Sequence, residues 1–120
     1  MIEPPYEYRA TVVRWVDGDT VIMDAELGFH VTSRWAFRLL GCNAPEEGKP
    51  GYQEAIDFVN KLAPVGTVVL AETHKTEKYG RWLVEVHLDG DAWTTVSAQL
   101  IAAGLAVPYF GGTRGVPVTP

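Results

Sequence analysis

The chain carries three polar side chains with oxygen donors at places where turns are predicted: Asp19, Asn43 and Glu46. Each has an ordinary explanation when taken alone, because Asp-Gly-Asp forms hairpin turns, Asn favours turns, and a Glu beside proline is typical of a solvated loop. Two arginines add positive charge. Arg38 stands inside an apolar run, where it could also extend to solvent, and Arg81 follows a polar turn. Together, such groups could form a local site in which a metal ion and guanidinium groups face a phosphate.

The net charge indicates what kind of partner to expect. Ten Lys and Arg residues against 15 Asp and Glu residues give a formal net charge of −5. An acidic chain is a poor candidate for binding nucleic acid through bulk electrostatic attraction. The balance does not exclude a small site with its own local charges, so the chemistry must be sought in particular residues.

Length and composition predict one globular domain. The chain has 120 residues, of which 47% are hydrophobic and 21% charged, and this excludes a wholly disordered chain. We expect a domain over residues 1–110 and a flexible tail over residues 111–120. No apolar run approaches the roughly 18 residues of a membrane helix. The first residues lack the basic and apolar regions of a secretory signal, so we expect a cytoplasmic location.

Cysteine and histidine usage gives no sign of a metal or redox centre. The single Cys42 excludes an intrachain disulfide and a thiolate-rich zinc site, and it is interpreted as a small buried group at a strand end. The three histidines, His30, His74 and His87, are far apart, and none has Cys or His at metal-ligand spacing. Each is therefore interpreted as an ordinary strand or surface residue.

The apolar periodicity predicts a mainly β, α+β architecture. Alternation with a period of two predicts five strands, at residues 8–15, 20–25, 30–41, 67–71 (or up to 74) and 82–88. Helical spacing predicts two helices, at residues 52–63 and 95–103, and the prolines and glycines of residues 43–51 predict a loop. Five short strands, with one helix between the third and fourth and one at the end, fit a closed barrel of the oligonucleotide-binding (OB) type. A plain α+β sandwich is the alternative.

Four blocks of sequence resemble the staphylococcal nuclease (thermonuclease) family. They are DGDT at residues 17–20, FRLLGCNAPE at 37–46, KYGR at 78–81 and GLA at 104–106. They occur in the family's order, and each stands at the end of a predicted element. The resemblance implies the same five-stranded barrel and a calcium-dependent cleavage of DNA and RNA phosphodiesters. The short, Gly- and Pro-rich stretch after Tyr109 predicts that the family's C-terminal helix is absent, so a homodimer is a possible source of further contacts.

The resemblance also implies roles for particular residues. Asp19 and Asn43 would bind Ca2+ through side-chain oxygens, and Ala44 through its backbone carbonyl. The family usually has an aspartate at the position of Asn43, and the loss of one charge predicts weaker calcium binding. Calcium accepts six to eight oxygen ligands, so a few protein oxygens and waters suffice.

The resemblance further implies that Glu46 is the general base for the attacking water and that Arg38 and Arg81 hold the scissile phosphate. Planar guanidinium groups suit this role because each can bond two oxygens of a phosphate that gains charge in the transition state.

The resemblance places four substrate-binding residues, with Lys78 and Tyr79 at the terminal phosphate and Leu83 and Tyr109 at the base and sugar. The expected partner is DNA or RNA, single-stranded or unpaired, because aromatic stacking tolerates any base. The alternatives are a non-catalytic nucleic-acid-binding barrel and a small structural or protein-interaction domain. We favour the nuclease because neither alternative has a chemical need for the full set of charged residues.

Overall fold

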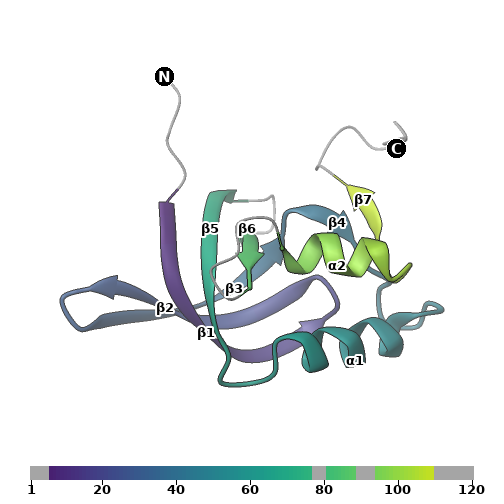
Figure 1. Cartoon of the computed structure of the whole chain (residues 1–120), viewed down its shortest axis with the longest axis horizontal. Coiled ribbons are helices and arrows are strands. Elements are labelled where there is room, and N and C mark those ends of the chain that lie inside the picture. The colour runs from purple at the N-terminus through teal and green to yellow at the C-terminus, as the bar shows by residue number, and fades with distance from the viewer. Residues whose placement is uncertain (1–5, 77–80, 89–93, 110–120) are drawn as a thin grey trace.

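Five strands close into a barrel in the computed structural model, which describes residues 6–76, 81–88 and 94–109 (Figure 1). Their order around the barrel is β1 (Tyr6–Asp17), β2 (Thr20–Gly28), β3 (Val31–Leu39), β6 (Trp82–His87) and β5 (Val68–Thr76). All neighbours are antiparallel except β3 and β6, which run parallel. The predicted barrel is confirmed and the sandwich is excluded. The tail expected at residues 111–120 lies outside the described residues.

Two helices and a small second sheet complete the fold. Helix α1 (Tyr52–Leu62) contacts β1, and α2 (Val96–Ala102) contacts α1, β4 and β6. The small sheet pairs β4 (Gly41–Asn43) with β7 (Val107–Tyr109). Among the described residues, no helix is long and apolar enough to cross a membrane.

The core follows the alternation of the strands. Alternate residues of β2 and of β6 are buried, and so are two residues on one side of α1. They are Val21, Met23, Ala25, Val84, Val86, Ala55 and Val59. The Trp15 indole N–H donates to the carbonyl of Ala63 at 2.9 Å, which joins β1 to the end of α1. Full burial of each of the larger side chains stabilises the folded barrel by about 1.5–3 kcal/mol.

The expectation of one continuous strand over residues 30–41 is wrong. Strand β3 ends at Leu39, and Gly41 adopts a φ of 90°, a conformation that is costly for residues with a side chain. The chain turns there and pairs as β4 with β7, a strand that the sequence did not predict because three residues show no alternation. Cys42 lies in β4 and is fully buried, as predicted.

The β2–β3 hairpin extends beyond the barrel, on the side away from β4 and β7 (Figure 1). The pairing of β2 with β3 continues to Gly28 and Val31, so the hairpin turns at Phe29 and His30. Phe29 and His30 at its tip both have positive φ, at 56° and 61°. The Phe29 side chain is 98% exposed, so the tip contributes nothing to the core.

Candidate catalytic site

The turn between β1 and β2 is held tightly at one end of the barrel. A Cβ on Gly18 would lie 2.8 Å from the Ala55 Cβ on α1 and 2.9 Å from the Ala44 Cβ after β4. Both distances are shorter than real Cβ contacts, so only glycine fits without movement of its neighbours. Next to it, the Asp19 carbonyl accepts a hydrogen bond from the Leu39 N–H at 2.8 Å. The packing of Gly18 and this bond fix where the Asp19 side chain points.

The buried Asp19 carboxylate joins three segments of the chain. Its Oδ2 accepts a hydrogen bond from the Ala44 N–H at 2.8 Å and lies 3.4 Å from the Arg38 Nη1. Its Oδ1 accepts a hydrogen bond from the Thr20 hydroxyl at 3.3 Å. The fold therefore brings two sequence-predicted residues, Arg38 and Ala44, into direct contact with Asp19.

Arg38 is enclosed by the turn that follows its strand. Its Nη1 donates to the carbonyls of Leu39 and Cys42, both at 3.0 Å, and its Nη2 donates to the Asn43 Oδ1 at 3.0 Å. The side chain is only 12% exposed, so Arg38 does not extend to solvent. These bonds fix the guanidinium beside both Asn43 and Asp19.

Arg81 reaches the same end of the barrel from the start of β6. Its Nη1 donates to the Thr20 hydroxyl at 3.3 Å, and Thr20 is the direct cross-strand partner of Arg38. Thr20 thus touches Asp19 and Arg81 at once. Sequence reasoning did not single out Thr20 as a site residue, although it is the last letter of the DGDT block.

Burial dominates the electrostatics of Asp19. The pKa of its carboxyl is raised to about 6, chiefly by the loss of water on burial and then by hydrogen bonding to the Asp17 carboxylate. The Arg38 charge and the Ala44 N–H act in the opposite direction but do not offset the burial. The pocket therefore holds a carboxylate whose negative charge is incompletely balanced, and a bound cation would supply the missing charge.

The donor set around Asp19 consists of oxygens. Asp19, the exposed Asn43 side chain and the Ala44 carbonyl are the predicted ligands, and Asp17 adds a further carboxylate. Asp17 lies close, because its Oδ1 accepts the Asp19 N–H at 3.2 Å. An all-oxygen set with two carboxylates suits a hard cation such as Ca2+. The residues present therefore fit calcium, and Asp17 is a candidate ligand that the sequence analysis had interpreted only as part of a turn.

Glu46 is not brought into contact with this cluster. Its side chain is exposed and makes no hydrogen bond or ion pair within the described residues, while its carbonyl accepts the Lys49 N–H at 2.9 Å. Ala44, two residues earlier, is bonded to Asp19. The loop that carries Glu46 thus begins at the site.

The four residues predicted to bind the substrate have different outcomes. Leu83 is half-buried on β6 and is the Cα partner of Arg38 in the parallel ladder. Tyr109 is 40% exposed on β7, opposite Gly41. Lys78 and Tyr79 lie outside the described residues.

A groove of about 310 Å³ opens beside the Asn43 side of the cluster. Its walls come from the loop after β4 and from the turn between α2 and β7, and consist of Asn43, Ala44, Pro45, Pro50, Gly51, Gly104, Leu105, Ala106 and Val107. None of these side chains is charged. The groove itself therefore offers no positive charge to an anionic ligand.

A closed five-stranded barrel with two helices defines a protein of the OB class, and this one gathers a buried carboxylate and two arginines at one end. Comparison with protein families identifies it further: the model described as staphylococcal nuclease homologue matches residues 36–115, two thirds of the chain. The chain belongs to the staphylococcal nuclease homologue family. No curated protein matches the sequence.

Proposed function

We propose that the protein is a calcium-dependent nuclease that hydrolyses phosphodiester bonds of DNA, RNA or both. The observation that carries this proposal is the buried Asp19 carboxylate, which touches Arg38 directly and Arg81 through Thr20, in a chain of a nuclease-type family. A carboxylate and two guanidinium groups at one point are the groups needed to hold a cation against a phosphate.

The metal site in this proposal is made by Asp19, Asn43 and the Ala44 carbonyl, with Asp17 as a further oxygen donor. A calcium ion held there would supply positive charge and so lower the cost of the extra negative charge that the phosphate oxygens gain during attack. Asp19 and Ala44 are buried and Asn43 is exposed, so solvent and a substrate would reach the ion from the Asn43 side.

Arg38 and Arg81 hold the non-bridging oxygens of the phosphate. Arg38 has five N–H donors, and its three described hydrogen bonds leave two of them for an oxygen of the substrate. Because these bonds already fix the guanidinium, little conformational freedom is lost when the phosphate binds.

Glu46 positions or deprotonates the attacking water. Its carboxylate is exposed and unpaired within the described residues, so it is free to accept a proton from water at the substrate. The bond between Ala44 and Asp19 anchors the start of its loop.

Single-stranded or unpaired nucleic acid is the proposed substrate, with Leu83 and Tyr109 beside the base and sugar and with Lys78 and Tyr79 at a terminal phosphate. The homodimer inferred from the sequence is a separate proposal, and sedimentation of the purified chain tests it.

A binding module without catalysis is the second candidate, and one observation favours it: the Glu46 side chain has no contact with the Asp19 cluster. The two functions differ in one experiment. Denatured DNA and RNA are incubated with the purified protein in calcium or in a chelator, and single-turnover cleavage is compared among the wild type, Glu46→Gln and the neighbouring exposed Glu47→Gln.

The nuclease proposal predicts cleavage that needs calcium, falls on the order of 10²-fold or more in Glu46→Gln and is unchanged in Glu47→Gln. Equal single-turnover rates in Glu46→Gln and Glu47→Gln would show that Glu46 is not the general base. Binding without cleavage under all conditions would favour the binding module.

A further inference from the structure

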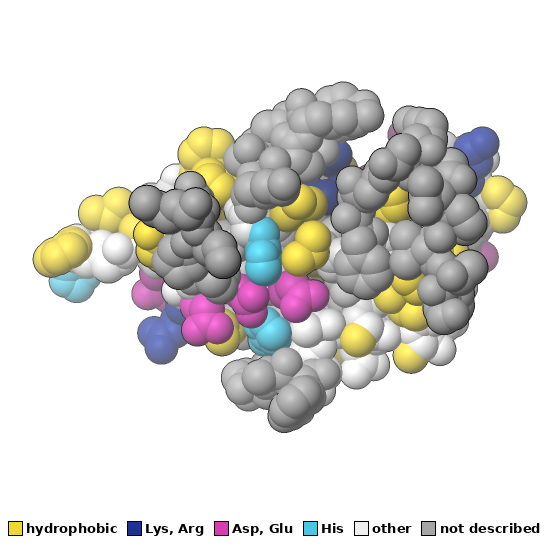
Figure 2. Space-filling view, turned by 90° about the horizontal axis from the view of Figure 1, so that it is seen from above, with side chains coloured by type: hydrophobic (Ala, Val, Ile, Leu, Met, Phe, Trp, Pro, Cys, Tyr) yellow, Lys and Arg dark blue, Asp and Glu magenta, His cyan; other side chains and the backbone are white. Residues whose placement is uncertain are grey.

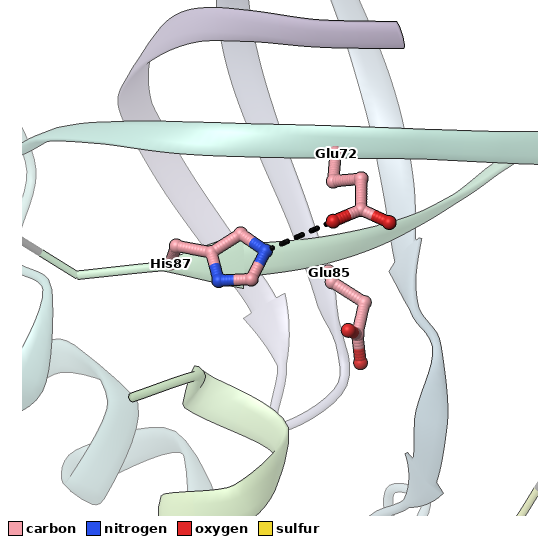
Figure 3. A group of neighbouring side chains, drawn as sticks. All are labelled: Glu72, Glu85 and His87. Atoms are coloured by element: carbon pink, nitrogen blue, oxygen red, sulfur yellow. Dashed lines mark hydrogen bonds and ion pairs between the residues drawn. The ribbon is translucent and has the colours of Figure 1, made fainter. Parts of the chain in front are cut away.

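Two glutamates and a histidine meet where β5 and β6 run side by side (Figure 3). Glu72 on β5 is the direct antiparallel partner of Glu85 on β6, and His87 follows two residues after Glu85 on the same face. One ligand atom from each of the three lies within 4.8 Å of the others. Neighbouring Val84 and Val86 fill the barrel core, so this trio faces outward from the barrel.

The two glutamates are a like-charged pair at directly opposed positions, which is unfavourable in a sheet unless positive charge compensates. Within the described residues Glu85 makes no hydrogen bond or ion pair. The printed distances join Glu72 to two histidines, from its Oε1 to the His87 Nε2 at 3.2 Å and from its Oε2 to the His74 Nε2 at 3.1 Å. Figure 2 shows acidic and histidine side chains together on this face of the molecule. Within the described part of the chain, no lysine or arginine forms an ion pair with either glutamate, and a bound cation would reduce their repulsion.

His87 is the anchor of the group. Its side chain is 8% exposed, and its Nε2 points toward the glutamates (Figure 3). Its buried Nδ1 has no hydrogen-bond partner in the described part of the chain. Without a metal ion, the Glu72 carboxylate can only accept, so its contact favours a proton on Nε2. Because no described group accepts from Nδ1 or donates to it, the proton can move to Nδ1 when a metal ion takes the Nε2 lone pair.

We propose that Glu72, Glu85 and His87 bind one divalent transition-metal ion of the zinc class. One imidazole nitrogen and two carboxylates are ligands typical of Zn2+, whereas Ca2+ takes oxygens alone. Three protein ligands leave a position for water. This site shares no ligand with the one proposed at Asp19, and it does not depend on the nuclease proposal.

Such an ion would join β5 to β6 at a weak part of the barrel. The ladder between these strands is regular from Leu70 to Thr73 and then shifts register before Thr76. A metal bound to both strands next to this irregularity would hold them together in addition to the backbone hydrogen bonds. We therefore expect the ion to stabilise the fold.

The test is zinc binding by the full chain after metal has been removed with a chelator. Isothermal titration with Zn2+, in excess calcium, is carried out on the wild type, Glu85→Gln, His87→Gln and a control, Glu26→Gln, on the exposed part of β2. We expect one zinc ion per wild-type chain, affinity at least tenfold weaker in Glu85→Gln and His87→Gln, and no change in the control. Equal affinity of the wild type and Glu85→Gln would overturn the proposal.

Glu85→Gln also distinguishes loss of a zinc ligand from loss of the folded structure. The variant removes one charge of a repelling pair, so its metal-free melting temperature should equal or exceed that of the wild type, while the rise on adding zinc should disappear. A zinc-induced rise that persists in Glu85→Gln would count against the site. Cobalt(II) provides the ligand signature, and a sulfur-to-cobalt charge-transfer band would show binding at Cys42 instead.

Two further variants separate this proposal from the nuclease. Asp19→Asn should keep zinc binding, and Glu85→Gln should keep any calcium-dependent cleavage. Loss of zinc binding in Asp19→Asn would place the ion at the Asp19 site and refute the second site, whereas absence of cleavage in every form would refute only the nuclease.

Discussion

Replacing Asp19 by Asn should stabilise the calcium-free protein at neutral pH. In the folded state burial raises the Asp19 pKa from 3.8 to about 6. One pKa unit corresponds to about 1.4 kcal/mol, so a shift of roughly two units corresponds to about 3 kcal/mol. The folded state keeps the proton more tightly than the unfolded chain. The free energy of unfolding therefore falls as the pH rises from about 4 to about 6, and stays lower above that window.

Asparagine has nearly the same shape as aspartate but cannot ionise. The free energy of unfolding of the variant therefore lacks the fall that ionisation of Asp19 causes in the wild type. Its amide oxygen can still accept the Ala44 N–H, and the weaker contact with Arg38 subtracts an amount that does not vary with pH in this range. Urea unfolding followed by tryptophan fluorescence, in chelator at about pH 4.5 and about pH 7.5, gives the difference between variant and wild type. About a third of the loss is already complete at about pH 4.5, so that difference should increase by about 2 kcal/mol in favour of the variant at the higher pH.

Asp57→Asn is the matched control, because Asp57 is an exposed carboxylate on α1 whose described bond is to Gln53. Its difference from the wild type should be nearly the same at both pH values. Calcium should stabilise the wild type at neutral pH and leave Asp19→Asn unchanged. A difference for Asp19→Asn that does not change with pH would refute the conclusion that Asp19 is buried with incompletely balanced charge.

Three further substitutions and one labelling experiment have defined outcomes. Asn43→Asp should tighten calcium binding by roughly tenfold, because it adds a negative charge to the ligand set; equilibrium dialysis measures this, and unchanged or weaker binding would contradict it. Gly18→Ala should lower the free energy of unfolding by about 1–3 kcal/mol, because the new Cβ meets two others below 3 Å; an unchanged melting temperature would show that the turn gives way easily. Arg81→Lys should reduce single-turnover cleavage by about 10²–10³-fold, with Arg34→Lys on the surface as the control without effect. Cys42 should resist thiol reagents until urea unfolds the protein, because burial raises the pKa of its thiol and excludes the reagent; fast labelling of the native chain would argue otherwise.

Local periodicity was enough to predict the barrel, because strand alternation and helical spacing are properties of short segments. A strand was predicted at residues 20–25, and its alternate residues Val21, Met23 and Ala25 are all buried in β2. The errors arise where a single backbone angle or a distant partner decides the structure. The positive φ of Gly41 ends the predicted third strand early. Strand β7 forms because its residues pair with those of β4, which are distant in the sequence.

The candidate site was accessible from the sequence only in part. The motif blocks pointed to Asp19 and Arg38, which lie in contact, and the sequence contained no signal that Thr20 would link Asp19 to Arg81. That link depends on the pairing of β2 with β3 and on the entry of the chain into β6.

The cluster on β5 and β6 was missed for a similar reason. Glu72 and His87 are 15 positions apart, and only the register of the two strands brings them together. Sequence spacing between histidines and cysteines carries no information about such a pair.

The pairing of β4 with β7 has a consequence for biosynthesis. Asn43 lies opposite Val107, so the segment that carries it acquires its partner only after more than sixty further residues have been made. During translation the residues around Asp19 emerge early but lack this support until β7 leaves the ribosome. The pairing that supports Asn43 can therefore form only after β7 has been synthesised, late in the production of the chain.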